Sequence, residues 1–439
     1  MNKVGHFFES ASTDPKKRQY HDLRVIIGKL QRGVTVTDEE LQQLQRQIEQ
    51  LEMEAWCLPR EGVSRTPAFR RQQRQIEGCN SSDLVNATKT IGKMFSGHAT
   101  SEGVKCFAAQ FGKESVAFYR PAQDVLVSSV GIGTCRGAID DDTDAAYAAA
   151  VHAALDRGVN LIDTSINYRD QRSERAVGAG IRLFIEKSGG KRDGVVVCTK
   201  GGYLVSEALT AGILRADDVV GGIHSMAPAF LGDQIERSRR NLGLETIDVY
   251  YLHNPETQLK FVGMSEFMNR IRVAFDRLEC AVSEGLIRWY GTATWHGYRC
   301  GAVSLRALAE TANQVAGDNH HFRFVELPFN LGMREALTRP VEYGSTVLDF
   351  AIELGITVIA SAALFKAFLS RDLPEDIAKM VPGLTSVAQR AIQFTRSTPG
   401  IASALVGMRD TAHVMENLAV ARTPPLTPVE YQRFFSTGF

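Results

Sequence analysis

The chain has 439 residues, and its 50 lysines and arginines balance its 50 aspartates and glutamates, so it carries no formal net charge. This balance disfavours a nucleic acid or another polyanion as the main partner. Hydrophobic residues make up 44% of the sequence, which is enough for a full core. The length fits one large domain with an extension, or two domains.

The seven cysteines are scattered along the chain, and no two of them form a Cys-x-x-Cys pair. Such a set is typical of reduced thiols and of neither a disulfide framework nor a zinc site. The first ten residues lack the apolar run of a signal peptide. No window approaches the ~18 apolar residues of a membrane span. We therefore expect a cytoplasmic protein with no membrane partner.

Residues 1–114 differ in character from the rest and are predicted to form a mostly helical or irregular extension. Thr37 is suited to cap a helix whose first turn holds the acidic residues 38–40. Apolar residues then follow at helical spacing, namely Leu41, Leu44, Ile48 and Leu51. This stripe could pack on the main body, on a partner protein, or on a second copy of the chain.

Beyond residue 114 a hairpin is predicted over 115–128, and then strands alternate with helices. The predicted strands cover 130–134, 161–165, 195–199, 247–253, 287–293, 322–329, 357–363 and 402–406. The predicted helices cover 142–157, 173–187, 227–242, 265–284, 304–316, 345–354, 386–396 and 411–421. Repeated strand–helix units predict an α/β fold with parallel strands. Eight units fit a closed (β/α)8 TIM barrel over 115–422, which leaves a C-terminal tail at 423–439.

Glycines follow several of the predicted helices, as expected where a helix stops before a strand: Gly158, Gly243, Gly285 and Gly355. The alternative architecture is an open, doubly wound sheet, whose usual fingerprint is a Gly-x-Gly-x-x-Gly turn. The first strand instead gives Gly131-Ile-Gly133-Thr-Cys-Arg136, with arginine where the third glycine would fall. We therefore prefer the barrel and interpret these glycines as a close approach of backbones at its first strand.

Four chemically versatile side chains fall at or just after the ends of consecutive predicted strands. Asp163 ends the second strand, Lys200 the third and His253 the fourth, while Tyr168 lies on the loop after the second. In a barrel, the ends of the strands meet at one mouth, where the active site lies. Alone, each residue has an ordinary structural interpretation, as a helix cap, a solvated charge, a packing ring or a core polar group. Their joint placement favours a catalytic set.

These four residue types suit the protonation of an oxygen while a hydride reaches the adjacent carbon. A phenol has an ordinary pKa of about 10, and a nearby ammonium lowers that pKa by favouring the phenolate. We expect Lys200 to lower the pKa of Tyr168, and Asp163 to hold Lys200 charged and oriented. An imidazole such as that of His253 can donate a hydrogen bond to a carbonyl oxygen.

Three motifs in the right order resemble the aldo-keto reductase family. Asp163-Thr-Ser-Ile-Asn-Tyr168 followed by Ser173-Glu174 resembles its DTAxxYGxxE motif. The run Arg239-Arg-Asn-Leu-Gly-Leu-Glu-Thr-Ile-Asp248 through His253 resembles its LxxLGLxxIDLYLLH segment, and Ile287-Arg-Trp-Tyr-Gly291 resembles its IRYIG strand. The resemblance covers about residues 120–422.

The resemblance implies a catalytic tetrad of Asp163, Tyr168, Lys200 and His253, with Tyr168 as general acid and His253 orienting the carbonyl. It also implies reduction of an aldehyde or ketone by NADPH, bound without a Rossmann domain. The expected NADP(H) contacts are Thr134, Thr294, Glu326, Leu364, Lys366, Gly407, Met408, Arg409 and Asn417. Of these, Arg409 and Lys366 are candidate partners for the 2′-phosphate.

Several positions depart from the family pattern. Ala293-Thr294 replaces the Ser-Asn pair after the fifth strand, and Glu326 replaces a glutamine on the sixth. Ser361 stands where an aromatic residue stacks on the nicotinamide, and Arg169 replaces the glycine after the tetrad tyrosine. These changes keep a second interpretation open, in which the chain is a non-catalytic nucleotide sensor or scaffold that binds a partner through residues 1–120. A third is a lyase or aldolase with Lys200 as a Schiff-base amine.

Two further features have no firm assignment. The long segment 201–226 carries His224 and Met226 and could cover the mouth and set specificity. His320 and His321 are adjacent, and adjacent residues entering a strand point to opposite faces, so we expect no metal site. A carbonyl compound is the expected substrate, and the extension could mediate homo-oligomer formation.

Overall fold

The computed structural model describes residues 93–111, 117–205, 209–371, 373 and 375–436. The chain divides into two compact units, Glu77–Tyr431 and a smaller unit of Met1–Ile76 with Gln432–Phe439. The helix predicted at 37–52 lies outside the described residues. In the smaller unit the description covers only residues 432–436, at the end of helix α16 (Pro428–Ser436).

A closed parallel barrel forms the centre of the larger unit and confirms the predicted (β/α)8 fold. Its strands, in spatial order, are β10, β11, β12, β3, β4, β5, β8 and β9, and β9 pairs with β10. Their bounds are β3 Val130–Gly133, β4 Leu161–Asp163, β5 Val196–Gly201, β8 Ile247–His253, β9 Ile287–Ala293, β10 Phe322–Pro328, β11 Thr357–Ser361 and β12 Ile401–Gly407. Each strand lies within two residues of its predicted bounds, and no open sheet edge remains in the barrel.

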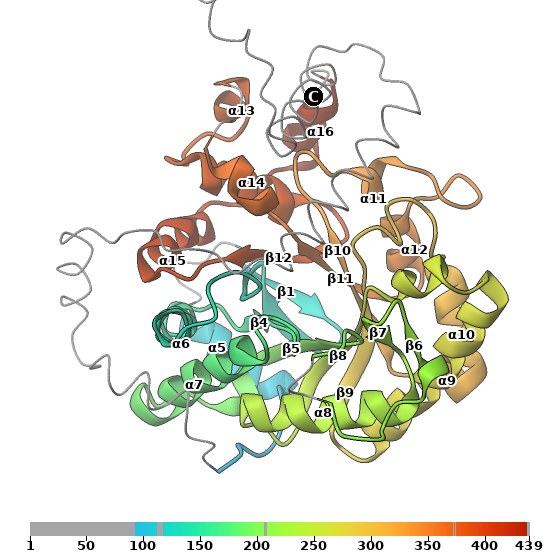
Figure 1. Ribbon diagram of the computed structural model, residues 1–439. Helices are drawn as coiled ribbons and strands as arrows, with labels where there is room; N and C mark the ends of the chain where they lie inside the picture. Colours follow the sequence, from blue (N-terminus) through green and yellow to red (C-terminus); the bar gives the residue numbers. More distant parts are fainter. Residues whose placement is uncertain (1–92, 112–116, 206–208, 372, 374, 437–439) are drawn as a thin grey trace, which may run out of the picture. The chain divides into compact units, whose positions relative to one another are not determined.

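The barrel helices lie outside the strands (Figure 1). They are α6 Asp141–Leu155, α7 Arg172–Lys187, α8 Pro228–Leu242, α9 Met264–Ser283, α10 Leu305–Ala316, α12 Val347–Glu353, α14 Val387–Ser397 and α15 Thr411–Asn417. The predicted last helix, 411–421, is α15 followed by a 3-10 helix at Leu418–Arg422. Short helices at Glu335–Thr338 (α11) and Glu375–Met380 (α13) were not predicted. Within the described residues, no helix combines the length and apolarity needed to cross a membrane.

The predicted helix stops are confirmed, because Gly158, Gly243, Gly285 and Gly355 all have a positive φ that suits glycine. The close approach predicted at the first strand holds for Gly131 only. A side chain at Gly131 would meet Leu405 Cδ2 at 2.8 Å, whereas one at Gly133 would meet nothing nearer than 4.0 Å. Gly133 pairs with Gly407 of β12, so the two leave a bare strip of backbone at the strand ends.

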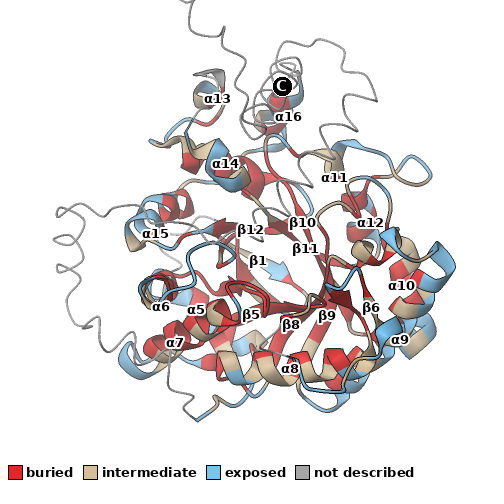
Figure 2. Cartoon of the chain, in the orientation of Figure 1, coloured by how far each residue is buried: buried red, intermediate tan, exposed pale blue. Residues whose placement is uncertain are grey.

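The core fills the barrel interior, and the strands are buried along most of their length (Figure 2). The predicted hairpin is present as β1 (Tyr119–Ala122) and β2 (Val125–Ser128). Its Ala122, Val125 and Val127 join the interior cluster. At its turn, Gln123 Nε2 donates to Gly355 O and Thr357 Oγ1, both at 2.9 Å. The hairpin therefore closes the N-terminal end of the barrel, and the other end is left for a site.

Residues 93–111, which we had assigned to the extension, are joined to the barrel. Helix α5 (Ser101–Ala109) packs on β2. The amide of Ala99 donates to Asp248 Oδ1 at 2.7 Å. Asp248 Oδ2 also accepts from Val197 N at 2.8 Å and pairs with Arg192 at 2.7 Å. This buried carboxylate thus ties the N-terminal segment, β5 and β8 together.

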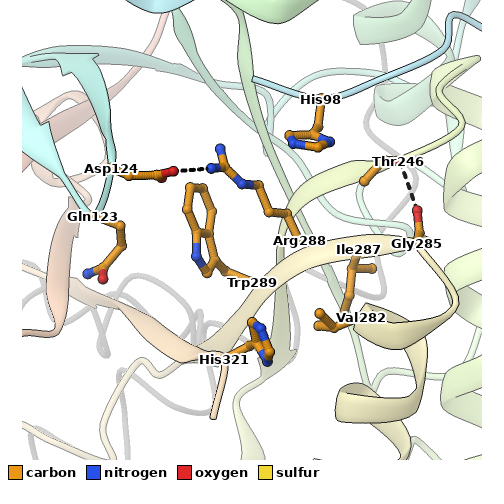
Figure 3. Close-up of a pocket in the computed structure, with 10 residues that line it drawn as sticks. All are labelled: His98, Gln123, Asp124, Thr246, Val282, Gly285, Ile287, Arg288, Trp289 and His321. Carbon is orange, nitrogen blue, oxygen red and sulfur yellow. Dashed lines mark hydrogen bonds and ion pairs between the residues drawn. The ribbon is translucent and has the colours of Figure 1, made fainter. Parts of the chain in front are cut away.

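A pocket of about 520 Å³ lies near the N-terminal ends of β8 and β9, opposite the strand ends that carry the tetrad (Figure 3). Arg288 crosses it, stacked 3.8 Å from the Trp289 ring and paired with Asp124 at 2.5 Å. The other lining residues are His98, Gln123, Thr246, Val282, Gly285, Ile287 and His321. The Arg288 guanidinium is already paired with Asp124, so it is not available as an unpaired charge for a ligand.

We predict that Asp248→Ala lowers the free energy of unfolding by about 3–5 kcal/mol, because it leaves the buried Arg192 guanidinium without its partner. Denaturant titration followed by circular dichroism measures this. The control is Glu186→Ala, which removes the more exposed Arg182–Glu186 pair and should cost no more than about 1 kcal/mol. Equal costs for the two variants would contradict the structural role of Asp248.

Candidate active site

Three of the predicted catalytic residues are set by strand positions, because β4, β5 and β8 are neighbours in the barrel. Asp163 is the last residue of β4, Lys200 the next-to-last of β5, and His253 the last of β8. All three are buried, with Lys200 fully so. Parallel strands bring their C-terminal ends to one mouth, as the sequence predicted.

Tyr168 is positioned by an unusual turn between β4 and α7. Arg169, Asp170 and Gln171 all have φ between 52° and 66°, a region that non-glycine residues rarely occupy. The Arg169 side chain donates from Nε to Ala138 O at 2.8 Å and also pairs with the buried Asp144. This anchoring explains how arginine occupies a position where a glycine would be easier to accommodate.

The charged centre of the site is Lys200 between two carboxylates. Its ammonium lies 2.6 Å and 2.5 Å from the two carboxylate oxygens of Asp163, and it donates to Thr164 O at 3.0 Å. Glu326 Oε2 also lies 3.2 Å from the ammonium but accepts no hydrogen bond of good geometry. Burial disfavours the charged ammonium, but Asp163 and Glu326 outweigh this and raise the pKa of Lys200.

The aromatic part of the site is a set of packed rings. The Lys200 ammonium lies 5.2 Å from the centre of the Tyr168 ring. The Tyr168 and His253 rings meet edge to face with centres 5.7 Å apart. Ser165 Oγ lies 3.2 Å from His253 Nδ1, which leaves Nε2 of the imidazole for another partner. The structure therefore brings all four predicted catalytic residues together.

The pKa of Tyr168 shifts in the direction opposite to our expectation. Burial raises it well above its usual value, and the Cys135 thiol and the Asp163 and Glu326 carboxylates raise it further. The expected lowering fails mainly because burial disfavours the phenolate, and also because two carboxylates offset the positive charge of Lys200. Burial and the Lys200 ammonium lower the pKa of His253 well below its usual value, so the imidazole is neutral. Tyr168 is thus a neutral acid beside a neutral imidazole.

A second layer of residues, which the sequence did not reveal, holds His253. His224 lies at the end of a short hairpin formed by β6 (Val219–Val220) and β7 (His224–Ser225) within the 201–226 segment. Its Nε2 lies 2.8 Å from His253 O, and its Nδ1 lies 2.9 Å from Gln258 Nε2. The Tyr203 ring packs against both histidines at 5.1 Å. His224 is fully buried, so it supports the site from behind and does not line the mouth.

The loop after β9 is fixed by another residue that sequence reasoning missed. Glu256 Oε1 accepts hydrogen bonds from the amides of Trp295, His296 and Gly297 at 2.9, 3.0 and 3.2 Å. Three convergent amides favour a negative charge. This contact holds the backbone next to Thr294, one of the predicted cofactor residues.

The predicted cofactor residues are distributed along this mouth. Thr134 Oγ1 donates to Asp163 O at 3.2 Å, and Thr294 N donates to Glu326 O at 2.9 Å. Met408 and Asn417 are buried, Leu364 is half-buried, and Gly407, Lys366 and Arg409 are exposed. Lys366 lies 5.6 Å from the centre of the Trp295 ring.

Two features of this mouth fit a bound dinucleotide. Several buried polar atoms on described residues have no hydrogen-bond partner, including Thr164 Oγ1, Asn167 Nδ2 and Thr294 Oγ1. Such atoms normally pair with something, and a carboxamide or phosphate supplies suitable partners. The bare backbone strip at Gly133 and Gly407 would allow a flat or charged group to approach closely. The residues present therefore fit a nucleotide cofactor.

Comparison with known proteins gives the class. The model of the Aldo/keto reductase family matches residues 129–317, from β3 to just beyond α10. An aldo-keto reductase from Bacillus halodurans in its holo form superposes with a TM-score of 0.54 at 20% identity, over 72% of this chain and 95% of that one. The family model makes the central part of the chain similar to the aldo/keto reductase family, and the solved structures share its barrel fold.

Two further relatives are informative. An aldo/keto reductase from Klebsiella pneumoniae, solved in complex with NADP and acetate, gives a TM-score of 0.52 at 22% identity over 74% of this chain and 95% of that chain. A protein of Arabidopsis thaliana described as a probable voltage-gated potassium channel subunit beta is 25% identical over 296 residues, which is 62% of this chain and 81% of that protein.

We predict that His224 makes stability fall as the solution becomes acidic. Burial lowers its pKa from 6.5 to about 4, so from about pH 6.5 downwards the unfolded chain binds a proton that the folded chain excludes. The free energy of unfolding should drop by up to about 1.4 kcal/mol per pH unit between these values. In His224→Gln this part of the slope should disappear.

Chemical denaturation at a series of pH values measures the slope for each variant. His413→Gln, at an exposed position on α15, controls for the exchange of histidine for glutamine. A His224→Gln protein with the same slope as the parent would show that the buried imidazole does not contribute to the acid sensitivity.

Proposed function

We propose that the protein is an NADPH-dependent oxidoreductase that reduces an aldehyde or ketone to an alcohol. The observation that carries this proposal is the packing of Tyr168 against both the Lys200 ammonium and the neutral His253 imidazole at the strand ends. This arrangement would let the protonated Tyr168 phenol and the neutral His253 imidazole contact the same substrate atom. A carbonyl oxygen that gains negative charge during reduction needs both.

The residues of this chain would divide the work as follows. His253, whose Nδ1 lies 3.2 Å from Ser165 Oγ, would direct Nε2–H at the carbonyl oxygen and orient the substrate in the tautomer where Ser165 donates to Nδ1. Tyr168 transfers its proton to that oxygen, and the resulting phenolate regains a proton from solvent. Asp163 and Glu326 keep Lys200 charged and in place. Bound NADPH would supply the hydride to the carbonyl carbon. The carbonyl compound, this hydride and the proton from Tyr168 together make the alcohol, so the reaction is balanced.

The unpartnered polar atoms and the glycine strip at the mouth support NADP(H) as the cofactor. The Klebsiella pneumoniae structure, which holds NADP, gives the same cofactor by likeness. Thr294 and Glu326 would bind the nicotinamide end, and Gly407, Met408 and Asn417 the adenosine end. Arg409 is exposed beside Asp410, the cap of α15, and its charge would select the 2′-phosphate.

The lyase or aldolase alternative has no support in the geometry. A Schiff base requires a neutral amine, which burial alone can provide. Here the carboxylates of Asp163 and Glu326, 2.5 and 3.2 Å from the Lys200 ammonium, hold it charged.

A second function is favoured by one observation, the likeness to a probable potassium channel subunit beta. On this proposal the barrel binds the nucleotide as a sensor, and residues 1–120 engage a partner protein or a second copy of the chain. The nicotinamide departures at Ala293, Thr294 and Ser361 support it. The complete tetrad favours the reductase, and the cytoplasmic location remains a prediction under both proposals.

We predict that Tyr168→Phe lowers kcat for carbonyl reduction by about 10²–10⁴-fold, because it removes the general acid. NADPH binding, followed by fluorescence, should be unchanged. Oxidation of NADPH is followed by absorbance with a panel of aldehydes and ketones. Tyr343→Phe, at a tyrosine that is 94% exposed, is the matched control and should behave as the parent. Tight NADPH binding without turnover of any carbonyl by the parent would favour the sensor.

We predict that Arg409→Ala weakens NADPH binding about ten- to a hundredfold, the value of a charged hydrogen bond to phosphate, and leaves NADH binding unchanged. Fluorescence titration with both nucleotides measures the ratio. Arg157→Ala, at an exposed arginine just after α6, should alter neither affinity. Equal losses for NADPH and NADH would assign Arg409 to general nucleotide binding and not to the 2′-phosphate.

A further inference from the structure

The two carboxylates at Lys200 form a buried group with an unbalanced charge. Asp163 Oδ2 lies 2.5 Å and Glu326 Oε2 3.2 Å from the same nitrogen, so the carboxylates are also close to each other. Asp163 is 4% exposed and Glu326 6% exposed. Among the described residues, Lys200 is the only cation in an ion pair with either of them. Two ionised carboxylates and one ammonium would give this buried site a net negative charge, and an uncompensated buried charge costs free energy.

Among the residues that the structure describes, no other group near Lys200 compensates for this charge. The titratable side chains that face the three residues from neighbouring strands and loops are Cys135, Tyr168, Cys198, Tyr251 and His253. The thiols and phenols are neutral or negative, and the imidazole of His253 is neutral. Burial and the Glu326 carboxylate raise the pKa of Asp163 well above its usual value, which agrees with a carboxyl pair that retains a proton.

We propose that Asp163 and Glu326 hold one proton between them, so that this pair and Lys200 together carry no net charge and Tyr168 keeps its own proton. Glu326 is then a positioning residue that acts on Tyr168 through the cluster. The consequence for turnover, which rests on the proposed reductase function, is a directional site. Carbonyl reduction needs the phenol and is favoured, whereas alcohol oxidation needs the phenolate and is suppressed until strongly alkaline pH.

Infrared difference spectroscopy of the purified full-length chain tests the shared proton directly. The parent should show the C=O stretch of a protonated carboxylic acid that is absent in Glu326→Gln. It should be equally absent in Asp163→Asn, because either single change leaves one carboxylate to pair with Lys200. The matched control is Glu335→Gln, which removes a carboxylate of α11 that pairs with Arg299. This variant should keep the carboxylic acid band of the parent.

The ionisation of Tyr168 gives a second readout that does not depend on turnover. Tyrosines carrying ¹³C at Cζ are followed by NMR, and the Tyr168 signal is assigned from its loss in Tyr168→Phe. At alkaline pH the carboxyl pair loses its shared proton before Tyr168 ionises, so that in the parent Tyr168 ionises beside one extra buried negative charge. Glu326→Gln lacks this charge, and its Tyr168 should titrate about one pH unit lower than in the parent. The alkaline limb of kcat/KM for reduction should fall by the same amount, and alcohol oxidation should increase.

Retention of the carboxylic acid band in both single variants would overturn the proposal, as would its absence from the parent or an unchanged Tyr168 titration in Glu326→Gln. Should Glu326→Gln fail to fold, the pH titration of the band in the parent and its loss in Asp163→Asn decide the question. Failure of the reductase function would be seen separately, as the predicted band and Tyr168 shift without NADPH oxidation by any carbonyl.

Discussion

One buried ammonium organises the functional end of this molecule. Lys200 is fully buried near the end of β5, and it remains charged because the carboxylates of Asp163 and Glu326 lie 2.5 and 3.2 Å from its ammonium. Removing the lysine would leave carboxylate charge without a partner in a medium where isolated charges are not tolerated. The position of Tyr168 over the ammonium and the neutrality of His253 follow from the same cluster. The chemistry proposed for the site therefore depends on the charges of Lys200 and its two carboxylates.

The barrel is what makes such a cluster possible. Asp163, Lys200 and Glu326 come from three strands, and only closure of the sheet, with β9 pairing to β10, brings Glu326 across to the other two. The hairpin β1–β2 fills the N-terminal end, and Asp248 ties the preceding segment to β5 and β8. The opposite end carries the unpartnered polar atoms and the glycine strip. The stabilising contacts described here thus lie at the N-terminal ends of the strands, and the proposed catalytic residues lie at the C-terminal ends.

Strand and helix alternation was enough to predict the barrel, because apolar strands, helix stops at glycine and eight repeated units leave few other architectures. Residues at strand ends could be placed at the mouth by the same rule. The pKa of Tyr168 could not be predicted, since its direction depends first on burial and then on Cys135, Asp163 and Glu326, which come together only in the folded barrel. His224 was expected to line the mouth, and Glu256 was missed, for a related reason, because their roles consist of contacts with backbone atoms of distant segments. A sequence pattern carries no signal for such contacts.

The most direct test of the reductase account is the fate of the hydride. The protein would be incubated with a reactive aldehyde or ketone and with NADPH carrying deuterium at C4 of the nicotinamide, each C4 stereoisomer separately, and the alcohol analysed by mass spectrometry. The account predicts that one stereoisomer delivers its deuterium to the former carbonyl carbon and the other does not. Alcohol formed without deuterium from either stereoisomer, or NADPH bound without any transfer across a broad panel of carbonyl compounds, would contradict it.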